Sequence, residues 1–314
     1  MRSCRTWLGF GLVPMALLSS TSPALTQHVA GPADDLRVAR PAYSTRGPRV
    51  LFDAAHHNVH TSDGRYKRFA DLISADGYQV IPNQRPFDAG HLSHASILVI
   101  VSALGADREV DPAASGRAAF TSAECDSVEM WVSRGGSLLL IVDHEPTGAA
   151  NAELARRFGV QLRDGTAMDP DSAHHWAGCL GCLRFTRTNG LLRTHPITSG
   201  RDSLERVRGA VSAAGQSVSG PSASFTFLLL GARAFDVLAS GDTVLSGGRA
   251  QGLALTFGAG RVVVLGEAAM LAGQAADRPT SPFRRWWAQE PGIDNRQLAL
   301  NVMHWLSRLL PATP

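Results

Sequence analysis

Residues 96–103 read Ser-Ile-Leu-Val-Ile-Val-Ser-Ala, and residues 137–142 read Ser-Leu-Leu-Leu-Ile-Val. Both stretches are apolar almost throughout, which is typical of parallel strands that helices cover on both faces. Between them, Thr121-Ser122-Ala123-Glu124 has the pattern of a capping box, and it predicts a helix that ends near Gly135-Gly136. A buried strand, a helix and a second buried strand in this order predict a parallel α/β sheet.

The same alternation continues on both sides of this unit. Further strands are predicted at 49–53, 78–82, 225–230, 235–239, 252–257 and 261–265, and further helices at 64–76, 150–158 and 294–310. Residues 258–260 form the predicted turn between the last two strands, and Asp294 is the expected N-cap of the closing helix. We therefore expect one doubly wound, mostly parallel α/β domain over residues 48–310. Residues 160–225 are less regular and are predicted to be an insertion or a cap over one edge of the sheet.

The first 24 residues have the pattern of a secretory signal peptide. Arg2 and Arg5 precede the apolar stretch 7–18, and Ser22-Pro23-Ala24 offers small residues at a cleavage site. The alternative is a retained membrane anchor. Residues 25–47 are predicted to be a flexible lead-in. No later stretch approaches 18 unbroken apolar residues, so we expect a secreted or periplasmic protein with no membrane span after cleavage.

The composition excludes several classes of protein. Hydrophobic residues make up 44% of the chain and charged residues 18%, which is typical of a globular protein and excludes a disordered chain or a fibre. The net charge is only +3, and no long basic run indicates a nucleic-acid partner. The patterns GxGxxG, Walker A, HExxH and GxSxG are absent, which argues against a standard phosphate loop and a common α/β serine hydrolase.

Three cysteines follow the predicted leader. Cys179 and Cys182 are separated by Leu-Gly, and in an oxidising compartment this spacing predicts a local disulfide. Free thiols, or a zinc site that includes the nearby His174 and His175, are the alternatives. Cys125 falls on the apolar stripe of its helix and is predicted to be a buried free thiol.

Three predicted strands end in carboxylates: Asp53, Asp143 and Glu267. His56 and His144 lie close to two of them. Because ligands bind beyond the carboxyl ends of strands in open α/β sheets, these five candidate catalytic residues are expected to line one cleft. Each has an alternative role as a helix cap or turn residue. A divalent metal held by Asp53, His56, Asp143 and His144 would also suit this chemistry. The candidate ligand contacts are Asn58, His195, Gln216, Asp294 and Asn295.

An ordered set of short motifs resembles an exported bacterial family of unknown function. These are Phe52-Asp53 with His56 and Asn58, Gly135-Gly136-Ser137 leading to Asp143-His144, His195-Pro196-Ile197, Gly215-Gln216-Ser217 and Gly266-Glu267-Ala268. The family is similar in fold to the class I glutamine amidotransferase-like superfamily. The resemblance spans residues 49–310 and implies a flavodoxin-like sheet.

The superfamily's amidotransferases place a nucleophilic Cys on a tight turn after a central strand. The comparable turn after 137–142 carries Asp143-His144-Glu145 here, so glutaminase activity is not expected. Two functions follow as hypotheses. The domain binds a small polar ligand, glycan or protein partner in the strand-end cleft, or it is a hydrolase, with or without a metal, that uses the carboxylate–histidine cluster.

Overall fold

The computed structural model describes residues 28–29, 36–176, 179–273, 275–276 and 292–313. The predicted signal peptide, and residues 25–27 and 30–35 of the predicted lead-in, lie outside these ranges. Export therefore stays a prediction. Within the described ranges, no helix combines the length and apolar character needed to cross a bilayer.

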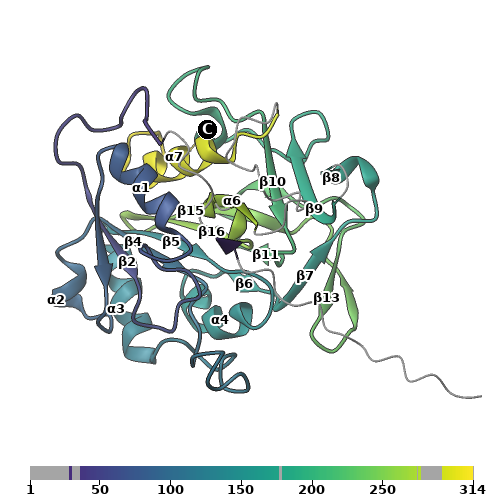
Figure 1. Cartoon of the computed structure of the whole chain (residues 1–314), viewed down its shortest axis with the longest axis horizontal. Helices are drawn as coiled ribbons and strands as arrows, with labels where there is room; N and C mark the ends of the chain where they lie inside the picture. Colours follow the sequence, from purple (N-terminus) through teal and green to yellow (C-terminus); the bar gives the residue numbers. More distant parts are fainter. Residues whose placement is uncertain (1–27, 30–35, 177–178, 274, 277–291, 314) are drawn as a thin grey trace, which may run out of the picture.

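The main sheet has nine strands, and one half of it is parallel (Figure 1). Its parallel strands lie in the order β3 (Gln79–Asn83), β2 (Arg49–Asp53), β4 (Ile97–Val101), β5 (Ser137–Ile141) and β16 (Gly260–Leu265). In this order the first parallel strand lies between the second and the third, as in flavodoxin-like sheets. The predicted doubly wound α/β fold is confirmed.

Helices cover both faces of the parallel half, as Figure 1 shows. One layer contains α1 (Lys67–Ala75), α6 (Ala269–Ala272) and α7 (Asn295–Leu306), and the other contains α2 (Ala89–Leu92), α3 (Ser122–Ser133) and α4 (Thr147–Arg157). The predicted capping box at the start of α3 is confirmed, because Thr121 Oγ1 accepts a hydrogen bond from the Glu124 N–H and Glu124 Oε2 accepts one from the Thr121 N–H.

Alternate residues of each strand enter two separate cores. In β4, Ile97 and Val99 pack with the α1 and α7 side, and Leu98 and Ile100 pack with the α3 side. Cys125 of α3 belongs to the second core and is a buried free thiol, as predicted. Burial raises the pKa of this thiol to about 11. The apolar strand runs thus reflect burial on both faces.

Strand pairing in the sheet changes from parallel to antiparallel at the hairpin of β15 (Ala250–Phe257) and β16. Strand β15 runs antiparallel to β16, and Gly258 forms the predicted turn with a φ of 57°. Beyond β15 the sheet continues through antiparallel strands: β12 (Phe225–Leu229), β11 (Val218–Ser219) and β6 (Gln161–Leu162). The sheet is therefore parallel on one side and antiparallel on the other.

The segment 160–225, predicted to be an insertion or a cap with less regular structure, contains several short elements. Besides β6 and β11 it contains β7 (Gly165–Met168), η1 (Ser172–His174), β8 (His175–Trp176), β9 (Cys179–Thr186), α5 (Pro196–Ser199) and β10 (Gly209–Ala213). Strands β10, β9 and β8 form one small sheet, β7 joins β13 (Phe235–Leu238) and β14 (Thr243–Leu245) in another, and β1 (His28–Val29) pairs with β17 (Ala275–Ala276). Most of these strands have only two to five residues, too few to show a clear apolar alternation.

The start of the closing helix also differs in detail from the prediction. Asp294 precedes α7, but its side chain makes no cap hydrogen bond within the helix. Its Oδ2 instead accepts hydrogen bonds from the Arg208 N–H at 2.6 Å and the Gly209 N–H at 3.4 Å. Asp294 is therefore the N-cap residue of α7, as predicted, but its carboxylate binds the start of β10 instead of an N–H group of the helix.

Candidate functional site

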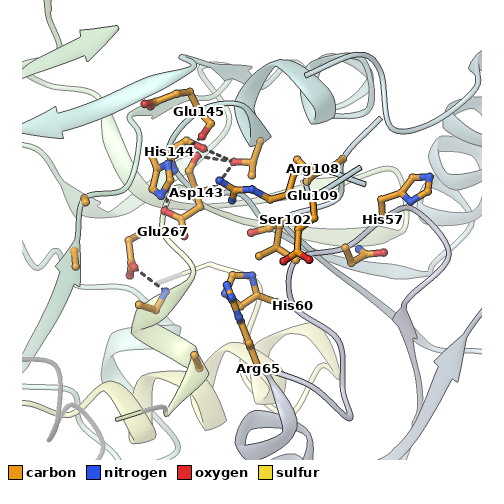
Figure 2. A pocket seen from close by; sticks show the side chains of 18 of the residues that line it. His57, His60, Arg65, Ser102, Arg108, Glu109, Asp143, His144, Glu145 and Glu267 are labelled. Atoms are coloured by element: carbon orange, nitrogen blue, oxygen red, sulfur yellow. Dashed lines mark hydrogen bonds between the residues drawn. The ribbon is translucent and has the colours of Figure 1, made fainter. Parts of the chain in front are cut away.

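A pocket of about 710 Å³ lies at the carboxyl edge of the parallel strands (Figure 2). Its walls are the loops that follow β2, β4, β5, β10 and β16. The lining includes Asn58, His60, Ser102, Asp143, His144 and Glu267. The volume is typical of a site for a small molecule.

Two neighbouring carboxyl groups form one wall of the pocket. Glu267 is fully buried, and its two oxygens accept hydrogen bonds from the N–H groups of Ala269 and Met270, both at 2.7 Å. Burial, and next the Asp143 carboxylate, raise the pKa of Glu267 well above its ordinary value. Burial also raises the pKa of the half-buried Asp143, although the nearby His144 opposes this. Two interacting acids of this kind hold a proton to a higher pH than either would alone.

Buried neighbours fix the position of this acid pair. Gln216 is fully buried and donates a hydrogen bond from Nε2 to the Asp143 carbonyl. The Asp143 N–H donates to Thr147 Oγ1 at 2.7 Å. Gly215 allows the loop after β10 to approach, because a Cβ there would lie 2.4 Å from Glu267 Cβ. Gln216, predicted to contact a ligand, therefore holds the backbone of Asp143 and is not part of the pocket lining.

Asp53 and His56 do not line the pocket, contrary to the prediction of one shared cleft. His56 Nδ1 lies 2.9 Å from the Asp53 carboxylate, and His56 Nε2 lies 2.9 Å from Glu124 Oε1. A protonated imidazole has an N–H on each ring nitrogen and can donate to both carboxylates at once. Burial alone lowers the pKa of His56, but Asp53 and Glu124 outweigh it and raise that pKa above 6.5. These three residues form a buried ion cluster that joins the end of β2 to the start of α3.

Asn58 connects this ion cluster to the pocket. Its Nδ2 donates to Asp53 Oδ2 at 3.0 Å, and the residue lines the pocket. Asp53 thus acts behind the pocket wall, where it also accepts a hydrogen bond from the Ala55 N–H at 3.3 Å. The turn-fixing alternative for Asp53 agrees with these contacts.

The remaining candidate ligand contacts are structural residues away from the pocket. The His195 ring stacks on Phe225 with 4.9 Å between centroids, and burial lowers the pKa of His195 to about 4. Asn295 pairs with the backbone of Val211, donating at 2.8 Å and accepting at 3.0 Å. Neither these residues nor Asp294 line the pocket. From the sequence alone, a polar residue that fixes the structure could not be distinguished from one that binds a ligand.

Backbone conformation marks residues that the sequence did not single out. His57, Ser102 and Ala214 have φ values of 47°, 48° and 52°, and all three line the pocket. Among the described residues, Arg308 is the only other non-glycine residue with a positive φ. Such conformations are disfavoured for L-residues and cluster at functional sites. His60, Arg65, Arg108 and Glu109 also line the pocket and were not predicted.

The structure divides the predicted metal ligands between two places. Asp53 and His56 belong to the ion cluster, and Asp143 and His144 to the pocket. In the described ranges, no group of three or more His, Cys, Asp or Glu side chains is arranged to hold a metal ion.

The cysteine pair is described only in part. Cys182 is disulfide-bonded, but the side chain of its predicted partner Cys179 lies outside the described residues. The pairing therefore stays a prediction. His174 Nδ1 lies 2.7 Å from Asp169 Oδ2, and His175 Nε2 lies 2.5 Å from the Asp169 carbonyl oxygen.

Comparison with known proteins shows likeness in structure and not in sequence. No protein-family model and no curated protein matches the chain. The mmIFT52 N-terminal domain is 14% identical, with a TM-score of 0.53 over 82% of this chain and 97% of that one. Cytoplasmic Protein STM1381 from Salmonella typhimurium LT2 is 14% identical, with a TM-score of 0.49 over 82% and 99%. A thua-like protein from Bacteroides uniformis ATCC 8492 is 12% identical, with a TM-score of 0.43 over 88% and 94%. At these identities the chain shares a fold with the first of these proteins, and its chemistry rests on its own residues.

Proposed function

We propose that this protein binds a small hydrophilic molecule, bearing hydroxyl or amino groups, in the strand-end pocket. The observation that carries the proposal is the convergence of His57, Ser102 and Ala214 on one pocket, each in a left-handed backbone conformation. They come from three separate loops. Strain of this kind persists where the surrounding structure enforces it, and it is concentrated at ligand sites.

The chemistry of the lining supports a polar ligand. Arg65 and Arg108 offer donors, and Glu109, Asp143 and Glu267 offer carboxyl oxygens. The described lining residues include no Trp, Tyr or Phe, so they offer no aromatic platform for a sugar ring in a long glycan. A single small molecule suits the volume and the mixed polarity better than a polymer does. We further propose that the protein acts outside the cytoplasm, on the basis of its leader-like first 24 residues.

A thermal-shift screen followed by calorimetry tests the binding proposal. The probes are glucose, galactose, myo-inositol, serine and glutamine. Ala269 lines the pocket, and Ala269→Arg would fill it; Leu204, which is 78% exposed and outside the lining, gives the matched control Leu204→Arg. We expect at least one probe to stabilise the wild type and Leu204→Arg but not Ala269→Arg. Equal stabilisation of all three proteins would contradict binding in this pocket.

A hydrolase is the second candidate, and the acid pair favours it. The raised pKa values of Asp143 and Glu267 allow one carboxyl to stay protonated as a general acid while the other is ionised as a base. Hydrolysis of 4-nitrophenyl glycosides and esters should then show a bell-shaped pH profile that Glu267→Gln abolishes. Glu205→Gln is the control, because Glu205 is also buried but is not in the lining. Loss of the activity in both variants, or in neither, would argue against the acid pair.

A further inference from the structure

Ser102 has an unusual place in the sheet. It directly follows β4, the middle strand of the parallel half, and has a φ of 48°. Its N–H donates to the Ile141 carbonyl at 2.8 Å, and its carbonyl accepts from the Val59 N–H at 3.1 Å. Hydrogen bonds to the segments on both sides therefore hold the left-handed conformation in place.

The Ser102 hydroxyl is buried and has no hydrogen-bond partner. The residue is 1% exposed and lines the pocket. Among the described serines, Ser246 is the only other one whose hydroxyl is buried without a partner, and it is not in the lining. A buried polar group without a partner needs an explanation, and a catalytic role is one of the recognised ones. Of the serines that the structure describes, Ser102 alone combines such a hydroxyl with a left-handed turn at a strand end in the pocket.

His60 directly follows the residue whose N–H binds the Ser102 carbonyl. Val59, its neighbour in sequence, donates to the Ser102 carbonyl, and both His60 and Ser102 line the pocket. Figure 2 shows the two side chains in the same part of it. The His60 ring is 6% exposed and packs edge-on against Tyr66, with 5.2 Å between centroids. Tyr66 is anchored in turn through its hydroxyl, which donates to the Ala268 carbonyl at 2.5 Å.

We propose that Ser102 Oγ is a nucleophile toward small polar carboxylic esters and that His60 is its base. This inference rests on the proposed binding of a small polar molecule in the same pocket. A serine on a strained turn at a strand end, with an imidazole to take its proton, is a recurrent arrangement for acyl transfer. Here it is carried by backbone geometry, since the sequence around Ser102 lacks the GxSxG pattern.

The reaction has two balanced steps. Ser102 Oγ bonds to the ester carbonyl carbon, and its proton passes to the His60 imidazole. The bond from that carbon to the alcohol oxygen then breaks, and the imidazolium returns the proton to the leaving alcohol. In the second step water attacks the acyl-serine, His60 takes one proton from the water and returns it to Ser102 Oγ, and the carboxylic acid is released.

Labelling of the full-length protein with a fluorophosphonate probe tests the assignment. Ser102 Oγ would displace fluoride at phosphorus, leaving a phosphonyl serine and hydrogen fluoride, and peptide mass spectrometry would place the adduct on Ser102. Ser102→Ala should not be labelled, whereas Ser246→Ala should be labelled like the wild type. His60→Gln should label roughly a hundredfold more slowly, the size expected from loss of a general base. Circular dichroism of each variant checks that it is folded.

The outcomes separate this inference from the proposed function. Labelling of Ser102 that depends on His60 supports the assignment. No adduct, or an adduct only at another serine in folded wild-type protein, overturns it. In that case, a molecule from the binding screen that stabilises the wild type but not Ala269→Arg would show that the pocket binds a ligand although Ser102 is not a nucleophile. If no such stabilisation occurs, the binding proposal has failed separately.

Discussion

Ser102 has a backbone conformation that glycine adopts without steric cost. At most positions a protein with alanine is at least as stable as the same protein with glycine, because glycine loses more conformational freedom on folding. At φ of 48° that order should reverse, since a left-handed conformation costs an L-residue about 1–2 kcal/mol. We therefore expect Ser102→Gly to be more stable than Ser102→Ala by about 1 kcal/mol.

Urea denaturation of both variants measures this difference. Ser246 provides the control, because its hydroxyl is also buried without a partner but its φ is not positive. Ser246→Ala should be at least as stable as Ser246→Gly. If Ser102→Ala is likewise at least as stable as Ser102→Gly, Ser102 is not strained.

The acid pair predicts a pH dependence at the residue scale. The pKa of Glu267 is raised by burial and by Asp143, so its contribution to stability is complete below the ordinary pKa of 4.5 and is lost as pH rises toward the raised value. Glu267→Gln cannot ionise and should remove this loss. Above pH 7 we expect the free energy of unfolding of the variant to equal or exceed that of the wild type. The excess should be about 1 kcal/mol for each pH unit by which the pKa of Glu267 lies above its ordinary value.

Glu205→Gln should respond in the opposite direction. Burial opposes ionisation of Glu205, but hydrogen bonds from Arg201 outweigh it and lower the pKa of that carboxyl. The variant should therefore lose stability at neutral pH. Chemical denaturation of both variants between pH 4 and 8 makes the comparison. A loss for Glu267→Gln equal to that for Glu205→Gln would mean that Glu267 serves mainly as an ionised cap for α6.

Part of this site could be predicted from sequence at the residue scale. Asp143, His144 and Glu267 were placed at the pocket by one rule, that the carboxyl ends of parallel strands share an edge. The same rule included Asp53 wrongly, because the direction of a side chain after a strand depends on its neighbours, here His56 and Asn58. Ser102 gave no signal, since its φ is imposed by contacts with residues distant in sequence.

Helix α3 is held at its start by an ion cluster as well as by its capping box. Glu124 bonds the Thr121 N–H with one oxygen and His56 with the other. Because the pKa of His56 is raised, the stabilisation is complete below pH 6.5 and disappears as pH rises through the raised pKa. His56→Gln should cost about 3 kcal/mol at pH 6, since it leaves two buried carboxylates without their cation. The cost should be smaller at pH 9.

Thr121→Ala is the matched control for this element. It removes the capping hydroxyl but no titrating group, so its cost of about 1 kcal/mol should be the same at both pH values. Guanidinium unfolding at pH 6 and pH 9 distinguishes the two variants. A cost for His56→Gln that does not change with pH would show that His56 is not protonated in the folded protein.

Helices and strands could be predicted where their burial requires a recognisable pattern of apolar residues in the sequence. The parallel strands are apolar on both faces, so the ends of β4 and β5 were located to within two residues from their composition. The short strands of 160–225 were not, because β10 and β9 are aligned by pairing with each other and not by a local pattern. Their register emerges only with the tertiary fold.

At the scale of the whole molecule, Cys125 offers a probe of global unfolding. It lies in the core beneath α3 at 0% exposure, and burial raises the pKa of its thiol to about 11, so the reactive thiolate is scarce. Reaction with iodoacetamide should therefore require unfolding and follow its denaturant dependence. Mass spectrometry identifies the labelled site, and Cys125→Ala gives the background. Fast labelling of Cys125 in buffer would show that this layer opens locally.

The pocket walls come from residues as far apart in the chain as His57 and Ala272. Strand β16, which precedes Glu267, lies between β5 and β15, so it enters the sheet beside a partner made more than a hundred residues earlier. On the ribosome, where chains emerge from the N-terminus, β2 to β5 are exposed long before β16 exists. During that interval the edge of β5 lacks its final partner and is open to wrong pairing. Synthesis thus leaves a period in which a chaperone would be useful, and it ends only when the last wall of the pocket has emerged.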